Sequence, residues 1–186
     1  ERLHALGLGV LAVEYPGYGK ASGEPSEESF YAVAEAALAQ LRGLGVPASR
    51  TVLQGQSIGS GVAAEMALRG HGARLVLLTP YTSMPEMARL VTSLLPGALL
   101  VRHRFDTLAK AERVELPVLV LHGTDDAVVP FEMGERLTAA FPRASFHAVE
   151  GGTHDLFAGR AQVLASQIFV FATKELPEGR ARRQPP

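Results

Sequence analysis

Short apolar runs alternate along the chain with segments whose apolar residues recur at helical spacing. The runs are continuous and carry β-branched residues, as in Leu8 to Tyr15, which is typical of strands buried on both faces of a parallel sheet. Alternating strands and helices imply right-handed crossovers, so the pattern predicts an α/β fold with a doubly wound, mostly parallel sheet. Strands are expected at 8–15, 51–54, 75–79, 118–121 and 145–149, and helices at 26–43, 58–69, 84–95, 105–112, 131–141 and 160–173.

The two ends of the sequence differ from this pattern. Residues 1–7 resemble the last turns of a helix that ends at Gly7, and the sequence does not begin with Met. We therefore expect the fold to be N-terminally incomplete. Residues 176–186 are rich in Pro, Arg and Gly, which predicts a disordered tail. One domain is expected over 1–175, with a short helical cap segment at about 80–114.

Composition excludes several classes of function. The 186 residues carry a net charge of −1, which gives no field that would attract nucleic acid or an anionic membrane. There is no Cys and no His-Glu-x-x-His, so neither a metal nor another cofactor is expected. The most apolar run, 90–101, is broken by Pro96-Gly97 and is too short to span a bilayer. These features favour a cytoplasmic location, unless an anchor precedes Glu1.

A serine, a carboxylate and a histidine follow three of the predicted strands. Ser57 lies in Gly-Gln-Ser-Ile-Gly between a strand and a helix, the form of a nucleophile elbow. Asp125 and Asp126 follow the strand 118–121, and His154 follows the strand 145–149. Because the carboxyl ends of parallel strands share one edge of a sheet, these groups are expected to meet. Histidine, with an ordinary pKa of about 6.5, is the natural base for a serine nucleophile.

The motifs together resemble the α/β-hydrolase superfamily, and within it the α/β-hydrolase-domain lipid hydrolases and protein depalmitoylases with their bacterial relatives. The order Ser, Asp, His is the chain order of that superfamily. The resemblance extends from near the start of the chain to the last predicted helix. Its motifs are Glu14 to Gly19, Ser22 to Ser26, Gly55 to Gly61, Thr79 to Met84, His122 to Pro130 and Glu150 to His154.

The resemblance implies roles for individual residues. The family pattern His-Gly-x-x-Asp places the catalytic carboxylate on Asp126, while Asp125 would face solvent or cap the loop. Ser57 would be the nucleophile, His154 the base, and the backbone N–H of Ile58 one donor of the oxyanion hole. The second donor usually follows an earlier strand, for which no counterpart precedes Leu8. A loop such as 16–19 is the alternative source.

The implied activity is a serine hydrolase that cleaves a small-molecule or lipid acyl ester or thioester through an acyl-enzyme. Contacts with substrate are expected from Tyr18, Tyr81, Leu94 and Leu95, although each could equally pack in the core. A serine peptidase or amidase uses the same groups, and a non-catalytic binding module is a further alternative. The glycines from Gly55 to Gly61 also fit a short-chain dehydrogenase, but no Tyr-x-x-x-Lys is present.

Overall fold

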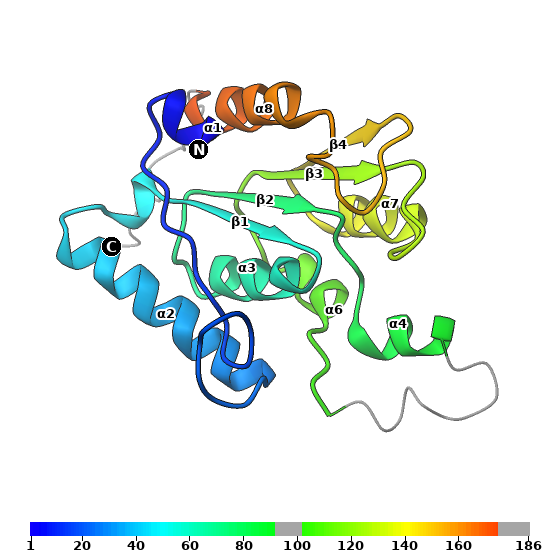
Figure 1. Ribbon diagram of the computed structural model, residues 1–186, viewed down its shortest axis with the longest axis horizontal. Helices are drawn as coiled ribbons and strands as arrows, with labels where there is room; N and C mark the ends of the chain where they lie inside the picture. The colour runs from blue at the N-terminus through cyan, green and yellow to red at the C-terminus, as the bar shows by residue number, and fades with distance from the viewer. Residues whose placement is uncertain (92–101, 175–186) are drawn as a thin grey trace, which may run out of the picture.

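Four parallel strands form a single sheet in the computed structural model, which describes residues 1–91 and 102–174 (Figure 1). Their spatial order, β1-β2-β3-β4, follows the order in the sequence. The predicted parallel α/β architecture is therefore confirmed. The strands are β1 (Val52–Gln56), β2 (Arg74–Leu78), β3 (Val118–Gly123) and β4 (Ala144–Val149).

Helices cover both faces of this sheet (Figure 1). One face carries α1 (Arg2–Ala5) and α8 (Ala161–Thr173), and the other carries α2 (Glu27–Gly43), α3 (Ile58–Leu68), α6 (Thr107–Ala111) and α7 (Phe131–Ala140). A 3₁₀ turn (Ala48–Arg50) precedes β1, and α4 (Met84–Val91) follows β2.

The two central strands explain why the apolar runs are continuous. Every residue of β2 and β3 is buried, and successive side chains point to opposite faces. Leu75 and Leu77 pack in the cluster beneath α3 and α7, whereas Val76 and Leu78 pack against α8. A strand between two helical layers buries side chains on both faces, so its apolar residues run continuously, whereas a half-buried strand alternates apolar and polar residues.

Helix α2 begins and ends where its sequence signals predict. The Ser26 hydroxyl accepts a hydrogen bond from the Ser29 N–H, and the Ser29 hydroxyl accepts one from the Ser26 N–H, which closes a capping box. Glu27 and Glu28 occupy the first turn, where negatively charged carboxylates interact favourably with the helix dipole. The rigid start of α2 matters for the site because it forms one wall of a cavity described below.

The prediction of a buried strand at 8–15 is wrong. These residues form irregular chain between α1 and α2, and Val10 and Leu11 are 56% and 48% exposed (Figure 1). An apolar run becomes a strand only when a neighbouring strand accepts its backbone hydrogen bonds. Among the described residues, β1 pairs with β2 alone, so residues 8–15 form no backbone ladder with the sheet. Its end is anchored by the Tyr15 ring, which stacks on Phe30 with centroids 4.4 Å apart.

The predicted cap segment contains α4 and α6, which confirms helical structure in both of its flanks. Leu94 and Leu95 lie outside the described residues, as does the predicted tail. Of the helices in the described part of the chain, none combines the length and the apolar character that crossing a bilayer requires.

Candidate active site

Ser57 lies at the sharp turn between β1 and α3. Its backbone has φ 49° and ψ −121°, a conformation that L-residues with side chains rarely adopt. The Ser57 N–H donates a 3.0 Å hydrogen bond to the carbonyl oxygen of Leu78, which ties the turn to the end of β2. Strain of this kind is retained when surrounding structure enforces it, and it often accompanies function. The backbone at Ser57 thus has the geometry of the predicted nucleophile elbow.

Gly55 makes the turn possible because the strand and the helix almost touch there. A Cβ at Gly55 would overlap the carbonyl oxygen of Gly59 and would lie 2.8 Å from the Cα of Ser60. Both neighbours are backbone atoms of α3, so they cannot move aside without displacing the helix.

We expect Gly55→Ala to destabilise the protein by about 3 kcal/mol or more, at the upper end of overpacking costs. Urea unfolding followed by circular dichroism measures the change. Gly43→Ala is the matched control, because nothing lies within 4 Å of a Cβ at that helical glycine. Equal stability of the two variants would contradict the close approach at Gly55.

His154 connects the serine to a carboxylate. Its Nε2 lies 3.0 Å from the Ser57 Oγ, and its Nδ1 lies 2.9 Å from the Asp126 Oδ2. The three side chains come from the loops after β1, β3 and β4, which the parallel sheet brings to one edge. The structure therefore brings together the serine, histidine and aspartate that the sequence singles out.

The structure also distinguishes the two adjacent carboxylates. The Asp126 side chain is fully buried, and its Oδ1 accepts hydrogen bonds of 2.9 Å from the N–H groups of both Val128 and Val129. Asp125 is exposed and accepts a 3.3 Å hydrogen bond from the Thr124 hydroxyl. Only Asp126 contacts His154, as the family pattern implies.

Three side chains that the sequence did not indicate hold the His154 loop. The Arg160 guanidinium donates to the carbonyl oxygens of Glu150 and Gly151 at 3.1 and 3.0 Å. Gln56 donates to the carbonyl of His154 itself at 3.3 Å. The Thr124 hydroxyl accepts from the Gly151 N–H at 2.9 Å. All three contacts involve backbone atoms, which carry no sequence signal.

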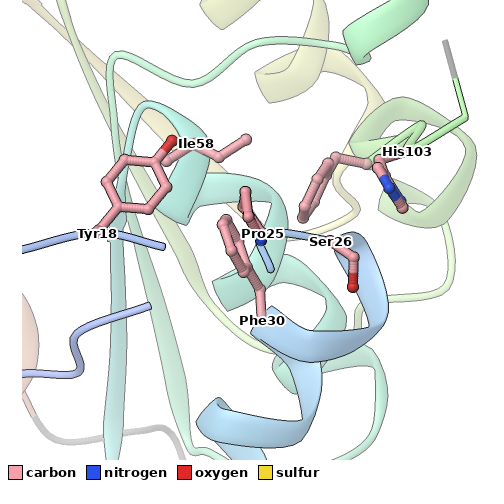
Figure 2. Close-up of a pocket in the computed structure, with 7 residues that line it drawn as sticks. Tyr18, Pro25, Ser26, Phe30, Ile58 and His103 are labelled. Carbon is pink, nitrogen blue, oxygen red and sulfur yellow. The ribbon is translucent and has the colours of Figure 1, made fainter. Parts of the chain in front are cut away.

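Ile58 is the first residue of α3, where helical N–H groups lack intrahelical acceptors. Its N–H therefore lies one residue from Ser57 and remains available to an incoming group, as the resemblance implies. The Ile58 side chain also lines a cavity of about 180 Å³ (Figure 2). The cavity is thus adjacent to the elbow.

The walls of this cavity are mostly apolar and aromatic. Phe30 contacts two other aromatic rings of the cavity wall. The Tyr18 ring meets it edge-on with centroids 5.9 Å apart, and the centroid of the Phe105 ring lies 5.8 Å from that of Phe30. Figure 2 shows Tyr18 and Ile58 on one side and Ser26 and His103 on the other. The lining residues are Tyr18, Pro25, Ser26, Phe30, Ile58, His103 and Phe105. The predicted position of Tyr18 near the site agrees with this geometry.

Tyr81 is placed differently from its prediction. It is 1% exposed and packs in the core, and its hydroxyl lies 2.6 Å from the position of a Cβ on Gly61. Burial raises the pKa of Tyr81, with Glu27 and Tyr15 adding to the effect. The ring fills the space that Gly61 leaves, and this burial argues against the expected contact with substrate.

Comparison with known proteins agrees with this geometry. Residues 92–160 match the sequence model of a family described as serine aminopeptidase, S33. An uncharacterised protein of Mycobacterium tuberculosis is 35% identical over 94% of this chain and 64% of its own length. The human α/β-hydrolase domain-containing protein 17C is 34% identical over 92% of this chain and 53% of its own length. The chain thus spans between half and two thirds of these relatives.

Solved structures share the fold at lower identity. A monoacylglycerol lipase of Paleococcus ferrophilus superposes with a TM-score of 0.71 at 20% identity, covering 91% of this chain and 85% of that one. An esterase from a Rhodococcus species gives 0.67 at 20% identity, covering 87% and 78%. The chain therefore has the fold of the α/β-hydrolases. In sequence it is similar to the α/β-hydrolase domain-containing protein 17C.

Proposed function

We propose that the protein is a serine hydrolase that cleaves carboxylic esters or thioesters through an acyl-enzyme. The observation that carries this proposal is the continuous hydrogen-bonded series from the Ser57 Oγ through both nitrogens of His154 to Asp126. A strained, half-buried serine next to a histidine base has the geometry of an activated nucleophile. Two proteins of the same fold are described as an esterase and a lipase, which supports this reaction class.

In the proposed reaction, the Ser57 Oγ attacks the acyl carbonyl carbon while its proton passes to the Nε2 of His154. Asp126 accepts the Nδ1–H of His154 and stabilises the imidazolium that forms. The Ile58 N–H stabilises the oxyanion of the tetrahedral intermediate. His154 then returns the proton to the departing oxygen or sulfur. Water activated by the same histidine breaks the Ser57–acyl bond, which releases the acid and restores the serine.

The cavity beside Ile58 is our candidate for the acyl-binding site. Its aromatic and apolar walls favour burial of a hydrocarbon or aromatic acyl group over a charged one. A small-molecule or lipid acyl ester fits this description. A peptide bond is a weaker candidate, because among the described residues no Asp, Glu, Lys or Arg lines the cavity to select a peptide.

The proposal is tested by labelling the purified protein with a fluorophosphonate and mapping the adduct by mass spectrometry. We expect one modified residue, Ser57, because only a serine with an aligned base reacts readily. Protein unfolded in urea before labelling is the control and should remain unmodified. Folded protein that stays unlabelled, or that is labelled at another serine, would contradict the proposal and would favour a non-catalytic binding module.

A further inference from the structure

His122 lies at the end of β3, four residues before Asp126, and its side chain is completely buried. Its Nε2 lies 3.1 Å from the carbonyl oxygen of Val129 and 3.3 Å from the Oδ2 of Asp126. That Oδ2 is the same atom that faces the Nδ1 of His154. The ring thus contacts both the backbone and the carboxylate that orients His154.

These partners define the protonation of the His122 ring. A carbonyl oxygen and a carboxylate can only accept, so Nε2 must carry the hydrogen. Nδ1 is buried and has no hydrogen-bond partner in the described part of the chain. A second hydrogen there would leave a buried donor unsatisfied and a cation in an apolar setting. Consistent with this, burial lowers the pKa of His122, with the contacts to Val129 and Asp126 opposing the effect.

The His122 ring packs directly against Gly134 of α7. A Cβ at Gly134 would lie 2.5 Å from the Nδ1 of His122 and 3.1 Å from its Cγ. On another side the Phe131 ring meets the imidazole edge-on, with centroids 5.7 Å apart. A glycine inside a helix costs stability relative to alanine, so its presence here fits a requirement for space.

We propose that His122 is a positioning residue, whose single Nε2–H is shared between the Val129 carbonyl and the Asp126 carboxylate and so fixes the carboxylate that orients His154. Asp126 then has three hydrogen-bond partners, namely the two N–H groups at its Oδ1 and His154, and the Nε2 of His122 lies 3.3 Å from its Oδ2 as a fourth neighbour. A buried carboxylate with these neighbours is held in one orientation. The catalytic part of this inference rests on the proposed function, whereas the hydrogen bond itself does not. The titratable groups that face His122 are Asp126 and His154.

The hydrogen bond is tested first in the unmodified protein, by ¹⁵N NMR of the histidine side chains. We expect the His122 ring to stay neutral, with its hydrogen on Nε2, at every pH from 5 to 9. A ring that is protonated at Nδ1, or that titrates in this range, would overturn the inference. This result does not depend on whether the protein hydrolyses any ester, so it separates the inference from the proposed function.

The positioning role is tested with His122→Leu and His122→Gln. Leucine removes the donor, and we expect kcat for an ester to fall by about tenfold, as for loss of one hydrogen bond to a charged group, with KM unchanged. Glutamine supplies an amide N–H near the position of Nε2 and should restore most of kcat. The low-field proton signal of the His154–Asp126 hydrogen bond should shift in the leucine variant alone. Equal kcat in folded wild-type and leucine proteins would overturn the positioning role.

Gly134→Ala provides a second route if the leucine variant does not fold. The added methyl should displace the His122 ring, so kcat should fall and the NMR signal of the His154–Asp126 hydrogen bond should shift. Gly43→Ala is again the matched control, since it adds the same methyl to a helix with open space. Combining Gly134→Ala with His122→Ala should show coupling, because the clash exists only while the ring is present. Strictly additive effects would count against the inference.

Discussion

Replacing Ser57 by alanine is expected to lower kcat for a p-nitrophenyl ester by about 10⁴-fold or more, as when other hydrolases lose a nucleophile of this kind. The substitution removes the atom that lies 3.0 Å from the Nε2 of His154 and leaves the backbone turn intact. Binding should survive because Ile58 and the cavity walls are unchanged. The measurement is the initial rate of ester hydrolysis at saturating substrate.

Two further variants separate loss of chemistry from loss of structure. Ser166→Ala removes a hydroxyl that donates to the carbonyl of Gln162 within α8, and it should leave kcat unchanged. Ser57→Gly should also abolish activity but should be at least as stable as the wild type, because glycine adopts a positive φ without strain. Hydrolysis that persists in Ser57→Ala would show that another group is the nucleophile.

Most of the site could be predicted because it depends on strand ends. Ser57, Asp126 and His154 follow apolar runs that β1, β3 and β4 confirm, and parallel strands bring such positions to one edge. Asp126 could be preferred over Asp125 only through the resemblance to a family pattern. The structure supplies the physical difference between them, which is the pair of backbone donors at the buried carboxylate.

The rest depends on which segments become neighbours, and the sequence pattern does not encode this. The run at 8–15 has the composition of a strand, but a strand also needs a partner to satisfy its backbone groups. Arg160 reaches backbone carbonyls nine and ten residues before it, through a loop whose path no periodicity describes. Similarly, His122 contacts Asp126 because the intervening turn folds back on β3.

Replacing Asp126 by asparagine is the second change expected to have a large effect, with kcat falling by about 10⁴-fold, as when a catalytic histidine is held in the wrong tautomer. The asparagine Oδ1 can still accept from Val128 and Val129, so its Nδ2 would face His154. A donor in that place favours the His154 tautomer that carries its hydrogen on Nε2. That nitrogen could then no longer accept the proton of Ser57.

Asp125→Asn is the matched control, since it makes the same chemical change one residue away on an exposed side chain. We expect it to retain wild-type kcat, whereas Asp126→Asn should fold normally by circular dichroism and still bind substrate. Fluorophosphonate labelling should slow in parallel with kcat in Asp126→Asn, because both reactions require the same base. If the two asparagine variants lost activity equally, the loss would reflect loop charge, and the contact between Asp126 and His154 would not be the source of catalysis. A large loss confined to Asp126 would instead tie the reaction to the single carboxylate that contacts both His154 and His122.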